Sequence, residues 1–143
     1  MLSKTRFSIA ETNRRNNCSV LALDGKILNL ELQGVIIEAQ YKLKDEFTLI
    51  FLTEDSPNDE GLHIYLISEN SLIADSLETN TVFTPGIFKL IKTGENWVEF
   101  TFFQNDSTYK LTVKKTKSLQ LALPRGWKYK EYLKLHRLMI QKL

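Results

Sequence analysis

The sequence has a single cysteine, Cys18, among its 143 residues, which excludes an intramolecular disulfide. No apolar run approaches the roughly 18 residues of a membrane-spanning helix. Charged residues interrupt the first 17 positions, where a secretion signal would be continuously apolar. Gly-rich phosphate loops and metal-ligand motifs are also missing from the sequence. We therefore expect a soluble, cytoplasmic protein that has no cofactor and folds without metal ions.

Charge is present, but it is sorted by position along the chain. Residues 1–17 hold 4 basic and 1 acidic side chain, a net charge of +3. Residues 18–113 hold 6 basic and 15 acidic side chains, a net of −9, and residues 114–143 hold 9 basic and 1 acidic, a net of +8. The near-neutral total of +2 hides this asymmetry. Such sorting points to a charged partner, an anionic surface or a self-complementary contact at one end of the molecule.

Alternation of apolar and polar residues runs through most of the chain and predicts β-strands. Residues 107–114 are the clearest case, because Tyr109, Leu111 and Val113 alternate with polar residues. Asp24-Gly25 is a strong signal for a two-residue hairpin turn. Short connections without helical patterning predict an antiparallel meander over residues 18–123. The expected strands are residues 18–23, 26–32, 46–53, 62–68, 72–77, 86–92, 97–103 and 107–114.

A change of apolar parity falls at Gln33-Gly34. Even positions are apolar before it and odd positions after it. An extra residue at the glycine would let both halves face one core. We therefore expect one long strand over residues 27–43, bent at Gly34.

The last 17 residues change pattern after Pro124-Arg125-Gly126. At about 100° per residue, eight apolar, aromatic or histidine side chains fall on one face of a helix. They are Tyr129, Tyr132, Leu133, Leu135, His136, Met139, Ile140 and Leu143. The sequence thus predicts a single α+β domain over residues 1–143 that is mainly β. Its antiparallel meander forms a barrel or a strongly twisted sheet, closed by an amphipathic C-terminal helix at 127–143. Residues 1–17 are either an extended arm or a short helix.

Two groups of charged residues are candidate contacts for a partner. The first is an acidic loop between two expected strands, with Glu54, Asp55, Asp59 and Glu60. It lacks the alternating Asp/Asn spacing of a calcium hairpin, so we interpret it as a solvated loop that can steer a basic partner. The second is the C-terminal segment, with Trp127, Lys128, Lys130, Lys134 and Arg137. Trp127 and Leu138 fall on the charged side of the expected helix, so either becomes a contact candidate if it is exposed.

Three further residues are candidates for chemistry. His136 lies on the apolar face of the expected helix and is interpreted as a hydrogen-bonded core histidine. His63 alternates with Leu62, and we expect it to face outward beside Tyr65. Cys18 is interpreted as a small buried residue at the start of a strand. General acid–base catalysis needs a positioned nucleophile or water, and the sequence shows no such set.

These observations favour a non-catalytic, cytoplasmic module that binds another protein. A stoichiometric inhibitor, of the kind that bacterial immunity proteins represent, would suit its size and sorted charge. Three alternatives remain open. The basic C-terminal segment could bind anionic lipid or nucleic acid, a barrel interior could carry a small ligand, and His63 with the acidic loop could catalyse a hydrolysis.

Overall fold

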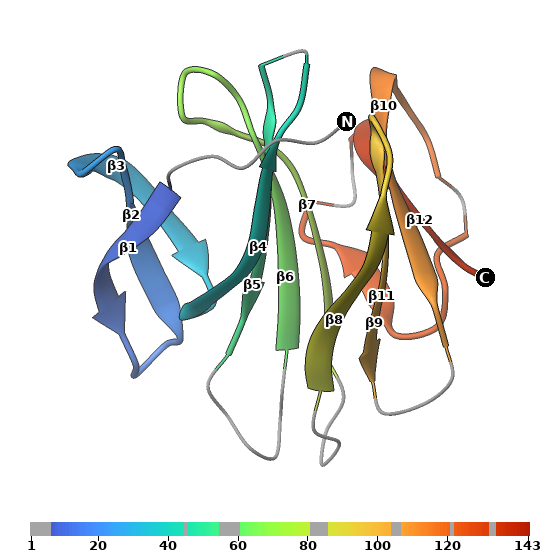
Figure 1. The fold of residues 1–143 in the computed structure, drawn as a ribbon, viewed down its shortest axis with the longest axis horizontal. Coiled ribbons are helices and arrows are strands. Elements are labelled where there is room, and N and C mark those ends of the chain that lie inside the picture. Colours follow the sequence, from blue (N-terminus) through green and yellow to red (C-terminus); the bar gives the residue numbers. More distant parts are fainter. Residues whose placement is uncertain are drawn as a thin grey trace.

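Figure 1 shows the computed structural model of the chain, in which residues 7–44, 46–54, 61–80, 86–103, 107–120, 122–131 and 134–143 are described. These residues form twelve strands in three antiparallel sheets, and none of them is helical. Consequently no helix in the described residues could cross a membrane. The expected α+β class is wrong, because this part of the chain is all β.

The first sheet is formed by the N-terminal residues. It has the order β1-β2-β3, and the turn at Asp24-Gly25 joins β2 to β3 as predicted. Phe7 pairs with Leu23 across β1 and β2, so the described part of the N-terminal segment contains a strand and no helix, and residues 1–6 lie outside the described residues. The strands are β1 (Phe7–Asn13), β2 (Cys18–Leu23) and β3 (Lys26–Gln33).

The second sheet has five strands in the order β11-β7-β6-β5-β4 and lies in the middle of the molecule (Figure 1). Both faces of β5 and β6 are buried, which is why β5 has no polar face in the sequence. Each fully buried Leu, Ile or Phe on these strands contributes about 1.5–3 kcal/mol. The strands are β4 (Ile36–Lys42), β5 (Thr48–Thr53), β6 (Gly61–Ile67), β7 (Ile73–Asn80) and β11 (Trp127–Tyr129).

The first sheet covers one face of the middle sheet, and the third sheet covers the other face. The third sheet has the strand order β12-β10-β9-β8. Its strands are β8 (Gly86–Thr93), β9 (Trp97–Phe103), β10 (Tyr109–Ser118) and β12 (His136–Lys142). One apolar core fills the space between this sheet and the middle sheet, centred on Phe51, Phe100 and Ile64. A smaller core, with Leu21 and Ile50, joins the middle sheet to the first sheet.

The expected barrel is also wrong. Each of the three sheets ends in an edge strand that has no neighbour among the described strands, so the sheets stay open. The meander does not close on itself because its strands separate into layers. The two apolar faces of the middle sheet are each covered, one by the first sheet and the other by the third sheet.

The expected C-terminal helix over residues 127–143 is replaced by β11 and β12, and residues 132–133 of that segment lie outside the described residues. His136, Leu138 and Ile140 are buried in alternation along β12, a period of two. Leu138 pairs with Val113 on β10. The segment is therefore a strand, which also explains why Leu138 and Trp127 did not fit the apolar face of a helix: both are buried in the core.

The bend at Gly34 is confirmed, but the single long strand through it is not. β3 ends at Gln33 and β4 begins at Ile36, and the two strands belong to different sheets. Gly34 has φ +114°, and an added Cβ would lie 2.6 Å from the Cβ of Leu52. Glycine therefore lets the chain pass between two layers at a point where a side chain has neither the backbone conformation nor the space.

Candidate functional site

A cluster of charged and polar side chains is largely buried on one face of the middle sheet, and it contains residues from both predicted contact groups. Glu54 follows β5, His63 and Glu78 are opposite each other on β6 and β7, and Lys130 follows β11. The structure thus places the start of the acidic loop beside the basic C-terminal segment. Asp55, Asp59 and Glu60 lie outside the described residues.

His63 lies between the two carboxylates of this cluster. Its Nε2 is 3.1 Å from Glu54 Oε1, and its Nδ1 is 3.5 Å from Glu78 Oε2. The ring is 1% exposed, so the expectation that it faces outward is wrong. Both ring nitrogens can donate to the carboxylates only when the imidazole is protonated. The ring is held between the two acidic side chains, with Nε2 at hydrogen-bond distance from Glu54 and Nδ1 in a longer contact with Glu78.

Glu78 is the carboxylate of the cluster that contacts the most basic side chains. Lys130 Nζ contacts its Oε2, and Lys128 Nζ lies 3.2 Å from its Oε1. The interaction with His63, followed by those with Lys130 and Lys128, holds the pKa of Glu78 well below its usual range, although burial acts in the opposite direction. The hydrogen bond from His63 likewise lowers the pKa of Glu54. Both carboxylates are thus stabilised in the ionised form.

Gln33 joins the two halves of the cluster. Its Oε1 accepts a hydrogen bond of 2.9 Å from Lys130 Nζ, and its Nε2 donates one of 3.3 Å to Glu54 Oε1. The backbone N–H of Gln33 donates to the Tyr65 hydroxyl at 3.0 Å. Burial raises the pKa of Tyr65, and it also raises that of the nearby Cys18 thiol. A thiol held protonated is a poor nucleophile. The charged side chains of the cluster pair with one another and form an ion network.

The second histidine belongs to a different cluster, as the sequence predicted for a core histidine. His136 Nδ1 lies 2.8 Å from Asp75 Oδ1, and the ring stacks on Tyr129 at a centroid distance of 3.4 Å. Asp75 also accepts the backbone N–H groups of Ser76, Arg137 and Leu138. Neither histidine has a hydroxyl or thiol at hydrogen-bond distance within the described residues. No three-residue group of His, Cys, Asp or Glu in this part of the chain could hold a metal ion.

The remaining predicted contact residues have distinct environments. Trp127 is buried, with its ring edge-on to Phe100 and Tyr109. Lys134 pairs with Glu131 at 3.1 Å. Arg137 donates to the carbonyl oxygens of Lys114 and Lys115, and its guanidinium lies over the Phe47 ring. Much of the basic charge of the C-terminal segment therefore interacts with other parts of the same chain.

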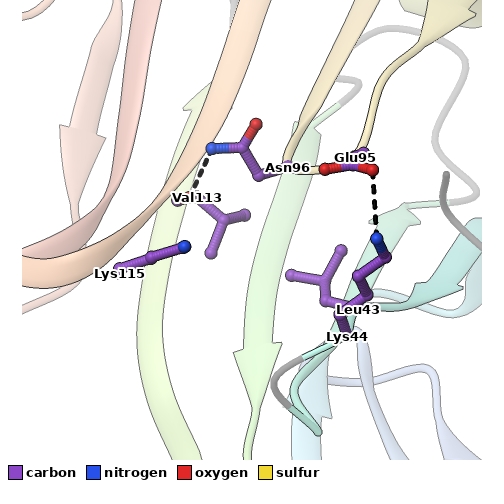
Figure 2. Close-up of a pocket in the computed structure, with 6 residues that line it drawn as sticks. All are labelled: Leu43, Lys44, Glu95, Asn96, Val113 and Lys115. Atoms are coloured by element: carbon purple, nitrogen blue, oxygen red, sulfur yellow. Dashed lines mark hydrogen bonds and ion pairs between the residues drawn. The ribbon is translucent and has the colours of Figure 1, made fainter.

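A cavity of about 450 Å³ lies between the β4–β5 connection and the third sheet (Figure 2). Leu43 and Val113 form its apolar part, and Lys44 and Glu95 pair across it at 3.0 Å. The Lys44 and Glu95 side chains are 75% and 69% exposed, so solvent screens the pair. None of the buried polar atoms that lack a hydrogen-bond partner in the described residues belongs to this cavity. Its side chains therefore point to no particular ligand.

The edge strand β8 has the densest group of exposed apolar side chains in the described residues. Ile87, Leu90 and Ile91 are 63%, 41% and 48% exposed. The pairing with β9 explains part of this exposure, because β8 has one extra residue between Gly86 and Lys89 and another between Leu90 and Lys92. Ile91 falls at the second bulge and has no pairing partner on β9. A bulge reorients side chains in this way.

The signals for these sites were only partly visible in the sequence. Glu78 and Asp75 are not among the predicted site residues, because the sequence around a lone acidic residue on a strand does not show whether it forms a buried ion pair or lies on a solvated face. The apolar run in β8 was visible, but it was interpreted as an ordinary strand.

Comparisons of the chain with protein-family models, curated proteins and solved structures found no match.

Proposed function

We propose that the protein is a non-catalytic binding protein, and that its partner is another protein that adds an extended segment to the free edge of β8. The observation that carries this proposal is the exposure of Ile87, Leu90 and Ile91 on one edge strand. Clustered apolar side chains on a protein surface mark contact sites, and an unpaired strand edge offers backbone groups for strand addition.

The other edges of the three sheets are less suited to such a contact. No large apolar side chain of β1, β11 or β12 is exposed, and β3 and β4 each have one, Ile27 and Ile36. β8 is therefore distinct among the described edge strands in combining a free edge with several exposed apolar residues.

Charge on β8 defines the partner. Lys89 and Lys92 lie on this strand, which has no acidic residue, and within the described part of the chain only Lys92 approaches a carboxylate, at 3.8 Å from Glu99. Lysines and bulges on an edge strand disfavour pairing with a second copy of the same edge. The partner segment is accordingly one in which apolar and acidic side chains alternate, so that carboxylates lie near the two lysines.

Site-specific cross-linking tests this proposal. A photoreactive amino acid replaces Ile91 in one variant and Ile27, the exposed residue of β3, in a matched control, and both are irradiated in a lysate of the source organism. We expect the Ile91 position to yield a specific partner peptide with alternating acidic and apolar residues. The Ile87→Lys/Ile91→Lys double variant, used as a competitor, should fail to suppress that cross-link, whereas the unmodified protein should suppress it.

Two results would overturn the proposal. One is cross-linking of the same peptides from Ile27 and Ile91. The other is a specific peptide from Ile91 that has no acidic residues, because the lysines of β8 would then play no part in recognition.

A further inference from the structure

A second cavity, of about 300 Å³, lies beside β11 and the start of β12. Its polar lining consists of Gln120, Lys128, Lys134 and His136, and its apolar lining comes from Leu119, Leu123 and the Tyr129 ring. The volume is at the small end of the range for ligand pockets. Among the described residues of the lining, the charged side chains are basic, and the apolar ones include Leu119, which is 65% exposed.

His136 has an unused polar atom next to this cavity. Its side chain is 3% exposed, and Nε2 has no hydrogen-bond partner in the described residues. Nδ1 is occupied by Asp75, and one face of the ring is covered by Tyr129. Nε2 is thus the one ring nitrogen of His136 that has no partner among the described residues. A buried polar atom without a partner is uncommon and calls for an explanation.

The two lysines that line the cavity are only weakly engaged. Lys128 shares Glu78 with Lys130, and its side chain is 71% exposed. Lys134 pairs with Glu131, which is 72% exposed, and lies 3.4 Å from the carbonyl oxygen of Ala74. Solvent screens the Lys134–Glu131 pair, and Glu78 keeps Lys130 when Lys128 leaves it, so either ammonium group can turn to a ligand at little cost.

The two lysines of the lining favour a negatively charged ligand. Asp75 lies behind the ring and is 1% exposed, and its other hydrogen bonds in the described residues come from backbone N–H groups. An anion in the cavity would stabilise the imidazolium, whose Nδ1–H and Nε2–H would then donate to Asp75 and to the anion. The same imidazolium would offset the charge of Asp75.

We infer that the cavity between Lys128, Lys134 and His136 binds a small organic anion, with an oxyanion head group at the cationic side chains and an apolar body against Leu119 and Leu123. The head group receives charge-assisted hydrogen bonds from the two ammonium groups and from Nε2. Two lysines match a dianion better than a monoanion, so a phosphate monoester fits the site better than a carboxylate does. This site is separate from the β8 edge and does not depend on it.

Histidine NMR provides a direct test, because the chain has only two histidines. Phenyl phosphate is titrated into the protein to about 10 mM, which detects dissociation constants near 1 mM, while the ring nitrogens are followed in long-range ¹H–¹⁵N spectra. We expect the Nε2 resonance of His136 to shift with saturation. His63, buried in its own ion network, is an internal control that should not move.

Three comparisons make the result specific. Phenol has the same ring without the charge and should leave His136 unshifted, and benzoate should bind more weakly than phenyl phosphate. The Lys128→Gln/Lys134→Gln variant should lose about tenfold in affinity for phenyl phosphate. The Lys89→Gln/Lys92→Gln variant, which removes equal charge from β8, should keep the original affinity.

The inference is overturned if no His136 shift occurs, or if phenol produces the same shift as phenyl phosphate. It is also overturned if both histidines shift together or if the two lysine variants lose affinity equally. Each of those results would mean that no anion is bound specifically beside His136.

Discussion

Asp75 and His136 connect the middle sheet to the C-terminal strand through a 2.8 Å hydrogen bond between two buried side chains. The other carboxylate oxygen of Asp75 accepts the N–H groups of Arg137 and Leu138, both at 2.9 Å. A residue on β7 thus supplies acceptors to a chain segment more than 60 positions later. This contact fixes the beginning of β12 as an extended strand.

Replacement of Asp75 by Asn should destabilise the fold by about 2–4 kcal/mol. The amide keeps the shape of the side chain but can offer only one acceptor oxygen, so buried donors lose their partner. Urea unfolding measures the loss, and amide exchange at Arg137 and Leu138 should accelerate more than at residues on β10. A loss below about 0.5 kcal/mol would show that the carboxylate does not hold this strand.

Leu138 and Leu135 distinguish a strand from a helix at the C-terminus. Leu138 is 1% exposed and Leu135 is 48% exposed, whereas the helical pattern put Leu135 on the apolar face and Leu138 on the charged side. Leu138→Ala should therefore cost about 2–4 kcal/mol, and Leu135→Ala less than about 0.5 kcal/mol. Thermal or urea unfolding of both variants decides the question, and the reverse ranking would favour the helix.

Gly34→Ala should destabilise the protein by about 1–3 kcal/mol, since it adds a Cβ against Leu52 at a residue with positive φ. Gly25→Ala is the matched control, because Gly25 also has positive φ (+84°) but no atom within 4 Å of the added Cβ. The difference between the two losses in urea unfolding isolates the steric contribution. Equal losses would mean that the close approach to Leu52 is relieved by a small shift of the chain.

The ion network around Glu78 should make stability depend on pH in the acid range. Its pKa is lowered in the folded protein, so the unfolded chain binds more protons as the pH approaches its ordinary value of about 4.3. The stability that Glu78 contributes is therefore complete above this value and decreases as the pH falls further. Unfolding free energies measured between about pH 7 and pH 3 should fall more steeply for the unmodified protein than for Glu78→Gln.

The control for that experiment is Glu69→Gln, which alters an exposed glutamate at the turn before β7. Its pH profile should follow that of the unmodified protein. A profile for Glu78→Gln that also follows the unmodified protein would show that the network does not favour the ionised carboxylate.

Much of the sheet structure could be predicted from local pattern, and the errors have a common physical cause. The turn at Asp24-Gly25 and the bend at Gly34 each depend on adjacent residues, and the structure agrees with them. The C-terminal error depends on a distant residue. Most of segment 127–143 fits a helical period, but the contacts of Leu138 with the third sheet and of its N–H with Asp75 favour a strand.

The charged cluster was predicted only in part for the same reason. Sequence separation suggested that Glu54 and Lys130 contact different partners, whereas the fold joins them through Gln33. The residues next to Glu78 in the sequence give no sign of its role, because that role comes from His63 on β6 and from two lysines near the C-terminus.

Protection of the β8 backbone in a complex tests the proposed binding mode most directly. The partner peptide identified by cross-linking at Ile91 is synthesised and added at saturation, and amide exchange is followed by NMR. Strand addition predicts at least about tenfold slower exchange for β8 amides that point away from β9, with no change in β12, the other edge of the same sheet. Unchanged β8 amides, or protection confined to β12 or to the first sheet, would contradict the account.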